Sequence, residues 1–136
     1  MRNISPHVQI YKFPITAISS IATRITGVGL TGLYLSYGTL CFFDKQDLIN
    51  SKYNSLNDNY KKVINYTILT PTVYHTLGGI RHFVWDKFPS KFLNNKSVSR
   101  SSFLLFGLTI PLTYASEKFL EYNECDQKKN IGFTFN

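Results

Sequence analysis

Two histidines and an aspartate share one face of a predicted helix in the middle of the chain. His75, Gly79, His82 and Asp86 are spaced by four, three and four residues, which places them on the same side of an α-helix. Imidazole and carboxylate groups suit an apolar core poorly, and inside a membrane they are costly unless they have partners. This face therefore indicates a haem or metal site at His75, with a hydrogen-bonded structural histidine as the alternative.

A pair of adjacent glycines lies beside this face. Gly78 and Gly79 each cost about 1 kcal/mol relative to alanine in the interior of a helix. Small residues at such positions let a neighbouring helix approach closely, and a flat cofactor would need the same clearance. We therefore expect a close contact with the helix backbone at this point.

A second polar group lies in the first apolar stretch of the chain. Ser20 and Arg24 are separated by four residues and share a helix face. Arg24 could extend its charged end to a nearby membrane surface. Alternatively, a guanidinium beside a hydroxyl is well suited to bind an anion or a carbonyl oxygen.

Length, charge and cysteine content exclude several classes of protein. At 136 residues the chain is expected to form a single domain, residues 1–136. Its net charge is +7, but the basic residues are dispersed and form no stripe with interleaved aromatics, so nucleic-acid binding is disfavoured. Its two cysteines, Cys41 and Cys125, fit neither a zinc site nor an iron–sulfur site.

The apolar residues are concentrated in three blocks, each near the roughly 20 residues that a membrane-spanning helix needs. We expect an all-α membrane protein with three transmembrane helices. The predicted spans are 15–43, 63–86 and 101–120, joined by a solvated loop over 44–62 and followed by a polar tail, 121–136. Three short spans without internal repeats are too few for a typical transporter.

The distribution of basic residues predicts the orientation. The stretch from Lys87 to Arg100 contains four basic residues and no acid. Such loops face the cytoplasm or the mitochondrial matrix. Arg2 and Lys12 place the N-terminus on the same side, and the first twelve residues lack the apolar core of a secretory signal peptide.

Two ordered motifs resemble a known family. The first comprises Ser5-Pro6-His7-Val8-Gln9-Ile10-Tyr11, Phe13-Pro14-Ile15-Thr16-Ala17-Ile18-Ser19-Ser20-Ile21 and Arg24-Ile25-Thr26-Gly27. The second is His75-x-x-x-Gly79-Ile80-Arg81-His82, ending in Trp85-Asp86. Together they resemble the two signatures of the cytochrome b large membrane-anchor subunit of succinate dehydrogenase, respiratory complex II. The third block agrees with that family only in position and hydropathy.

This resemblance implies a site for each polar group. The histidine at the position of His75 would be one axial ligand of a b-type haem, in a pocket that also involves Arg24, Gly79 and His82. Ser20 and Arg24 would line a ubiquinone-binding pocket, with Asp86 near its mouth. Arg24 could stabilise negative charge on a reduced quinone or on a haem propionate.

The resemblance also implies partners and a location. A second small membrane-anchor subunit would pack against this chain and supply the other haem ligand. An iron–sulfur subunit and a flavoprotein subunit would carry the clusters and the FAD, and would oxidise succinate. The isolated chain would have no catalytic activity. We expect a multi-pass protein of the mitochondrial inner membrane, or alternatively of a bacterial inner membrane.

One position departs from the family pattern. Thr23 precedes Arg24, where family members usually carry a histidine. A threonine can donate a hydrogen bond there but cannot carry charge. The alternative function is therefore a structural anchor of the same complex that has lost its haem and only supports assembly.

Overall fold

The computed structural model describes residues 12–133, with side chains described as far as Asn123. Its elements are all α-helices: α1 (Ile15–Phe42), α2 (Gln46–Asn54), α3 (Asp58–Lys87), α4 (Pro89–Phe92) and α5 (Asn95–Phe133). The predicted all-α class is confirmed over this range. Residues 5–11 of the first family motif lie outside the described residues.

Helix α1 matches the first predicted span almost to the residue. It begins after Pro14, whose fixed backbone suits a helix start, and ends before Asp44, which adopts a left-handed conformation with φ of 56°. Of the described helices, α1 alone is long and apolar enough to cross a membrane, with a mean hydropathy of 1.2 over 18 residues. Membrane crossing by 63–86 and 101–120 stays a prediction.

The connection 44–62 is not the loop that the sequence predicts. It contains α2, and α3 already begins at Asp58. Asp58 in the first turn of α3 interacts favourably with the partial positive charge of the helix N-terminus. The Tyr53 hydroxyl donates a hydrogen bond to Asn65 Oδ1 at 2.9 Å and fixes α2 to α3. All of α2 remains solvated, since none of its residues is buried.

The segment predicted as a polar tail is also helical for most of its length. Helix α5 continues past residue 120 to Phe133. No proline follows Pro111, and the Lys118–Glu121 pair lies at the i, i+3 spacing that supports an exposed helix. Hydropathy marks only where a helix is apolar, so it cannot indicate where the helix ends.

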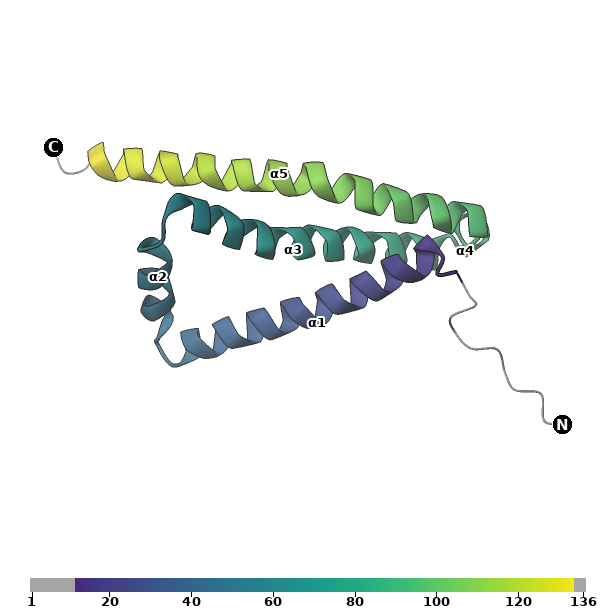
Figure 1. The fold of residues 1–136 in the computed structure, drawn as a ribbon, viewed down its shortest axis with the longest axis horizontal. Coiled ribbons are helices and arrows are strands. Elements are labelled where there is room, and N and C mark those ends of the chain that lie inside the picture. The colour runs from purple at the N-terminus through teal and green to yellow at the C-terminus, as the bar shows by residue number, and fades with distance from the viewer. Residues whose placement is uncertain (1–11, 134–136) are drawn as a thin grey trace.

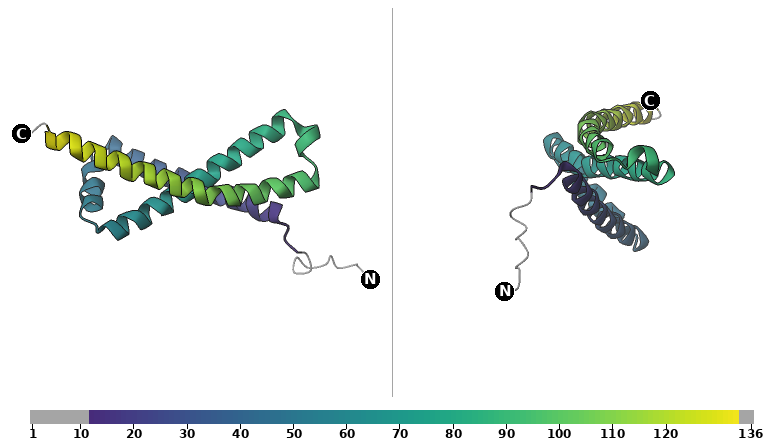
Figure 2. Two further views of the ribbon diagram at one scale, coloured as in Figure 1. Left: turned by 90° about the horizontal axis from the view of Figure 1, so that it is seen from above. Right: turned by 90° about the vertical axis from the view of Figure 1, so that its right-hand side faces the viewer.

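The three long helices form an open bundle. Helix α5 lies along α3, whereas α1 meets α3 at the end near α4 and diverges from it toward α2 (Figure 1). The view from above shows that the helices cross at an angle and are not parallel (Figure 2). The start of α1 and the basic connection around α4 therefore lie at the same end, as the predicted orientation requires.

The bundle buries polar side chains and exposes apolar ones. The most buried side chains include Ser19 and Ser102 at 0% exposure and Glu117 at 1%. Large apolar residues such as Val28 and Ile110 are both 76% exposed. Exposed apolar surface on this scale marks contact with lipid or with other helices. The pattern is the one expected of a membrane protein whose polar groups face its interior.

An ion-pair cluster joins α3 to α5 around Lys62 and Glu121, which lie just outside the predicted spans. Glu121 lies 3.0 Å from Lys62 Nζ and 2.6 Å from Lys118 Nζ. Hydrogen bonds from Lys118 and then Lys62 hold the pKa of Glu121 below its ordinary value of 4.5. The same contact with Glu121 raises the pKa of Lys62 above its ordinary value of 10.5.

We expect Glu121→Gln to lower the unfolding temperature of the detergent-solubilised protein near neutral pH. The depressed pKa of Glu121 means that its contribution is complete above 4.5 and is lost as the pH falls through the folded value. The raised pKa of Lys62 means that its contribution is lost at high pH. Unfolding temperatures measured across pH should therefore converge at both extremes. Asp44→Asn is the control, because Asp44 is exposed, forms no ion pair with the described residues, and has a left-handed backbone conformation that asparagine also adopts.

Candidate functional site

His75 of α3 contacts the backbone of α1. Its Nδ1 lies 3.0 Å from the Thr23 carbonyl oxygen and 3.5 Å from Thr26 Oγ1. A carbonyl oxygen only accepts hydrogen bonds, so the network assigns the proton to Nδ1. The other ring nitrogen, Nε2, then carries a free lone pair. Metal-ligating histidines typically show this arrangement, in which a second hydrogen bond fixes the tautomer and the ring orientation.

Two glycines make this contact possible, one on each helix. A Cβ at Gly27 would lie 2.7 Å from His75 Cε1, closer than real atoms approach. A Cβ at Gly78 would lie 3.1 Å from Thr23 Oγ1, so α3 admits that side chain in return. The predicted close approach is therefore present at Gly78. At Gly79 a Cβ would meet nothing within 4 Å among the described residues.

The substitution Gly27→Ala tests this packing. We expect it to lower the unfolding temperature, because the new methyl group would displace the His75 ring and break its bond to Thr23. Without a clash, glycine to alanine in a helix would instead stabilise by about 0.5–1 kcal/mol. Gly29→Ala is the matched control, since a Cβ there meets nothing within 4 Å. Equal shifts for both variants would contradict the assigned contact.

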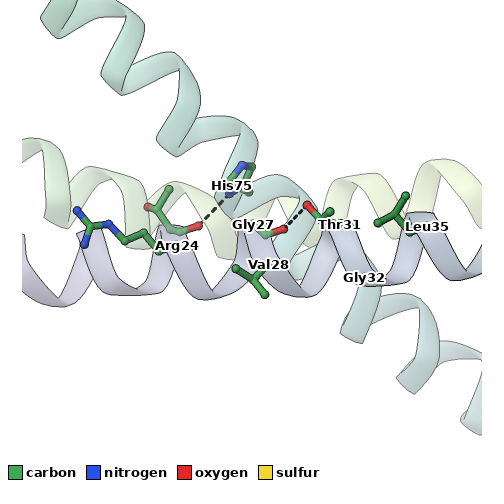
Figure 3. A pocket seen from close by; sticks show the side chains of 8 residues that line it. Arg24, Gly27, Val28, Thr31, Gly32, Leu35 and His75 are labelled. Carbon is green, nitrogen blue, oxygen red and sulfur yellow. Dashed lines mark hydrogen bonds between the residues drawn. The ribbon is translucent and has the colours of Figure 1, made fainter.

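An open groove of about 750 Å³ runs along α1 beside His75 (Figure 3). Arg24 lies at one end of it and Leu35 at the other. The Thr31 hydroxyl already donates to the Gly27 carbonyl at 2.9 Å, which leaves imidazole and guanidinium as the main polar groups. The lining residues are Thr23, Arg24, Gly27, Val28, Thr31, Gly32, Leu35 and His75. A groove of this size with few polar groups is suited to a large, mostly apolar ligand.

The structure brings only some of the predicted site residues together. His75 and Arg24 line the same groove, and Arg24 is exposed there. Ser20 is half-buried one turn earlier on α1, outside the lining. Asp86 is exposed near the C-terminal end of α3. His82 is exposed outside the groove. Its ring is edge-on to that of Trp85, with the two ring centroids 5.2 Å apart.

A buried polar cluster that was not predicted from the sequence lies between the three long helices. Arg81 donates hydrogen bonds to Ser19 Oγ at 3.2 Å and to Ser102 Oγ at 3.0 Å. Its guanidinium also stacks on Trp85, 4.5 Å from the ring centre. Tyr74 on the same helix donates to the Ser19 carbonyl at 3.0 Å.

A sequence signal for this cluster does exist. Tyr74, Gly78, Arg81 and Trp85 have the same four, three and four spacing as the predicted face, shifted by one residue. Three of these residues, Tyr74, Gly78 and Arg81, are the buried residues of α3. The face that packs inside the bundle is therefore adjacent to the face that the sequence indicates as a candidate site.

Comparison with known proteins identifies the family. A model of the succinate dehydrogenase/fumarate reductase transmembrane subunit family matches residues 1–115, which is most of the chain. The chain belongs to this family. The match includes α1, α3 and the first half of α5, and so contains the whole groove and the buried Arg81 cluster.

Named relatives of this family agree. The mitochondrial succinate dehydrogenase cytochrome b560 subunit of Dictyostelium discoideum is 34% identical over 90 residues, 61% of this chain and 44% of that protein. The b560 subunit of Reclinomonas americana is 34% identical over 125 residues, 82% of this chain and 81% of that protein. The b556 subunit of Rickettsia felis is 36% identical over 93 residues, 62% of this chain and 67% of that protein.

These matches bear on the predictions in two ways. The predicted family is confirmed, and mitochondrial and bacterial relatives in a transmembrane family support an inner-membrane location. The match spans less than half the length of the Dictyostelium relative and about two thirds or more of the other two.

Thr23, where the resemblance leads us to expect a histidine, has a structural role in this family member. Its hydroxyl donates to the Ser19 carbonyl at 2.9 Å, and its side chain packs against Gly78. Its carbonyl oxygen accepts a hydrogen bond from His75 Nδ1. Thr23 therefore orients the imidazole through its backbone, an interaction that does not depend on the identity of its side chain.

Proposed function

We propose that this chain is the large membrane-anchor subunit of a succinate dehydrogenase, that it helps form the ubiquinone-reduction site, and that it holds a b-type haem. Membership of the family supports the anchor role. The observation that carries the finer proposal is the His75 imidazole, held by a backbone carbonyl with Nε2 free beside the α1 groove. The cytochrome b names of the relatives agree with it.

The groove residues fit a haem. The imidazole has the tautomer that a metal ligand needs, and Gly32, where a Cβ would meet nothing within 4 Å among the described residues, leaves room along α1. His75 would be the axial ligand, and Arg24 could interact with a propionate. A bound haem supplies one-electron redox chemistry at a potential tuned by its ligands and surroundings. The second axial ligand would come from the small anchor subunit.

The ubiquinone site would use the inner end of α1. The Ser20 hydroxyl can donate a hydrogen bond to a quinone carbonyl, and the Arg24 guanidinium can stabilise the negative charge that develops as the quinone is reduced. Arg24 forms no ion pair or hydrogen bond with the described residues, so its donors are available. Asp86, exposed near the end of α3, could deliver protons from the inner aqueous phase.

The remaining steps belong to proposed partners. An iron–sulfur subunit would pass electrons to the quinone, and a flavoprotein subunit with FAD would oxidise succinate. These subunits would bind the end of the bundle that carries Lys87 to Arg100, which we assign to the matrix side. Spans 63–86 and 101–120 would cross the membrane with α1.

A structural anchor without haem is the second candidate. Thr23 favours it, because the threonine side chain supplies no charge for a propionate and its hydroxyl is already bonded to Ser19. This candidate keeps the same partners and membrane topology, but it leaves the imidazole of His75 as a helix–helix contact only.

The dithionite-reduced minus oxidised spectrum of the complex containing this chain, purified in detergent, distinguishes the two. The proposed function predicts a b-type α band, together with succinate-dependent ubiquinone reduction by the same preparation. A complex that reduces ubiquinone without a b-type band would support a purely structural role for His75. A complex that oxidises succinate with an artificial acceptor but cannot reduce ubiquinone would contradict the quinone site.

A further inference from the structure

Arg81 is a buried cation at the meeting point of the three long helices. It is 8% exposed, and its two bonds reach Ser19 on α1 and Ser102 on α5. The hydroxyl oxygens of those two serines lie 3.0 Å apart. A guanidinium suits this position because its rigid fork of donors can bridge two acceptors at once. Its Nε has no partner among the described residues.

Hydrogen bonds connect this cluster to the proposed haem ligand. The Ser19 carbonyl accepts from the Tyr74 hydroxyl at 3.0 Å and from Thr23 Oγ1 at 2.9 Å. One turn further along α1, the Thr23 carbonyl accepts from His75 Nδ1. Helix α3 thus holds α1 at Ser19 through two side chains and at Thr23 through a third.

These contacts determine how α1 is placed on α3. Ser19 and Thr23 are four residues apart, roughly 6 Å along the helix axis. Two anchored points on one face fix both the axial position of α1 and its rotation. Ser20 and Arg24 follow the anchored residues directly, so their placement depends on the same contacts. Away from this end, α1 diverges from α3 (Figure 1).

We propose that Arg81 is a positioning residue: by bridging Ser19 and Ser102 it fixes α1 against α3 in the register that brings the Thr23 carbonyl to His75 Nδ1. This inference rests on the proposed function for its consequence at the haem and quinone sites. Arg81 itself does not line the groove.

A cysteine pair can report the register without haem or quinone. The Thr23 Cβ lies 3.8 Å from the position that a Cβ at Gly78 would take, which is the separation found in disulfides. Thr23→Cys with Gly78→Cys, in a background with Cys41→Ala and Cys125→Ser, should therefore cross-link under mild oxidation. The rate would be measured in native membranes containing the assembled complex, by alkylation and mass spectrometry.

Variants of the cluster are then compared in this background. We expect Arg81→Met to slow cross-linking on the order of tenfold, because it removes the hydrogen bonds from α3 to both serines. We expect Ser102→Ala to slow it a few-fold, because it removes one of those two bonds. Ser101→Ala is the matched control, since among the described residues Ser101 bonds only the Val98 carbonyl of its own helix. In the chain without added cysteines, Ser102→Ala should also raise the KM for ubiquinone a few-fold, with a smaller change in kcat.

Ser102→Ala keeps the test decisive if Arg81→Met fails to assemble, because it removes one hydroxyl and leaves the cation in place. Cross-linking in Ser102→Ala equal to that in Ser101→Ala would overturn the inference. A wild-type complex with neither a b-type band nor ubiquinone reduction would instead overturn the proposed function. The cross-linking rate separates the two failures, because it depends on neither ligand.

Discussion

His75→Ala is expected to abolish the b-type absorption band of the complex. The substitution removes the imidazole that, among the described residues, lines the groove with a free Nε2. The fold should survive, since the lost bond to the Thr23 carbonyl contributes about 0.5–1.5 kcal/mol. The measurement is the dithionite-reduced minus oxidised spectrum, normalised to the flavin content of the purified complex.

His82→Ala is the informative comparison for this result. His82 is on the same helix seven residues later, but it is exposed and contacts Trp85 outside the groove. The structure therefore predicts that the band survives in this variant. A band that persists in His75→Ala would reject the axial role of His75. Loss of the band in His82→Ala alone would instead assign the haem ligand to His82, which shares the predicted helix face with His75.

The first helix and the C-terminal end of α3 could be predicted from the sequence, whereas the start of α3 and both ends of α5 could not. From Ile25 to Phe43 the chain has no charged residue, so hydropathy and Pro14 together define α1. Helices α3 and α5 extend beyond their apolar parts into polar sequence. There the helix is maintained by backbone bonds and surface pairs such as Lys118–Glu121, which an apolar window does not detect.

Two residues of the candidate site could be predicted from the sequence, but its geometry could not. Residue type and spacing identified His75 and Arg24, and both line the groove. The turn of α1 that meets His75 could not be deduced, because spacing within one helix says nothing about its neighbour. Two glycines decide that contact, Gly27 for the imidazole and Gly78 for Thr23.

The face of α3 that packs inside the bundle could not be predicted from the sequence, for a physical reason. Residue types indicated a candidate site on the face with His75, His82 and Asp86, but they did not indicate which face is buried. The bundle interior takes Tyr74, Gly78 and Arg81, whose polar atoms find partners on α1 and α5. Buried polar groups must be hydrogen-bonded, and only the three-dimensional arrangement reveals which face supplies those partners.

The largest expected loss of function without loss of the fold is that of Arg24→Ala. Hydrogen bonds to charged groups are worth about 1.5–3 kcal/mol, so ubiquinone reduction should fall roughly 10- to 150-fold. Arg24 is exposed on α1 and bonds no other described residue, so its removal should leave the bundle intact. Succinate oxidation with an artificial electron acceptor should remain near the wild-type rate, because that reaction needs neither the quinone nor this chain.

Lys52→Ala is the control for a general effect of charge. Lys52 is an exposed basic residue of α2, at the opposite end of the bundle from α4 and away from the groove (Figure 1). We expect it to leave both activities unchanged. If Arg24→Ala lowers the two activities together, Arg24 acts in assembly and not on the quinone. If ubiquinone reduction alone falls and the b-type band is retained, the guanidinium serves the quinone, because a propionate partner would be expected to change the band as well.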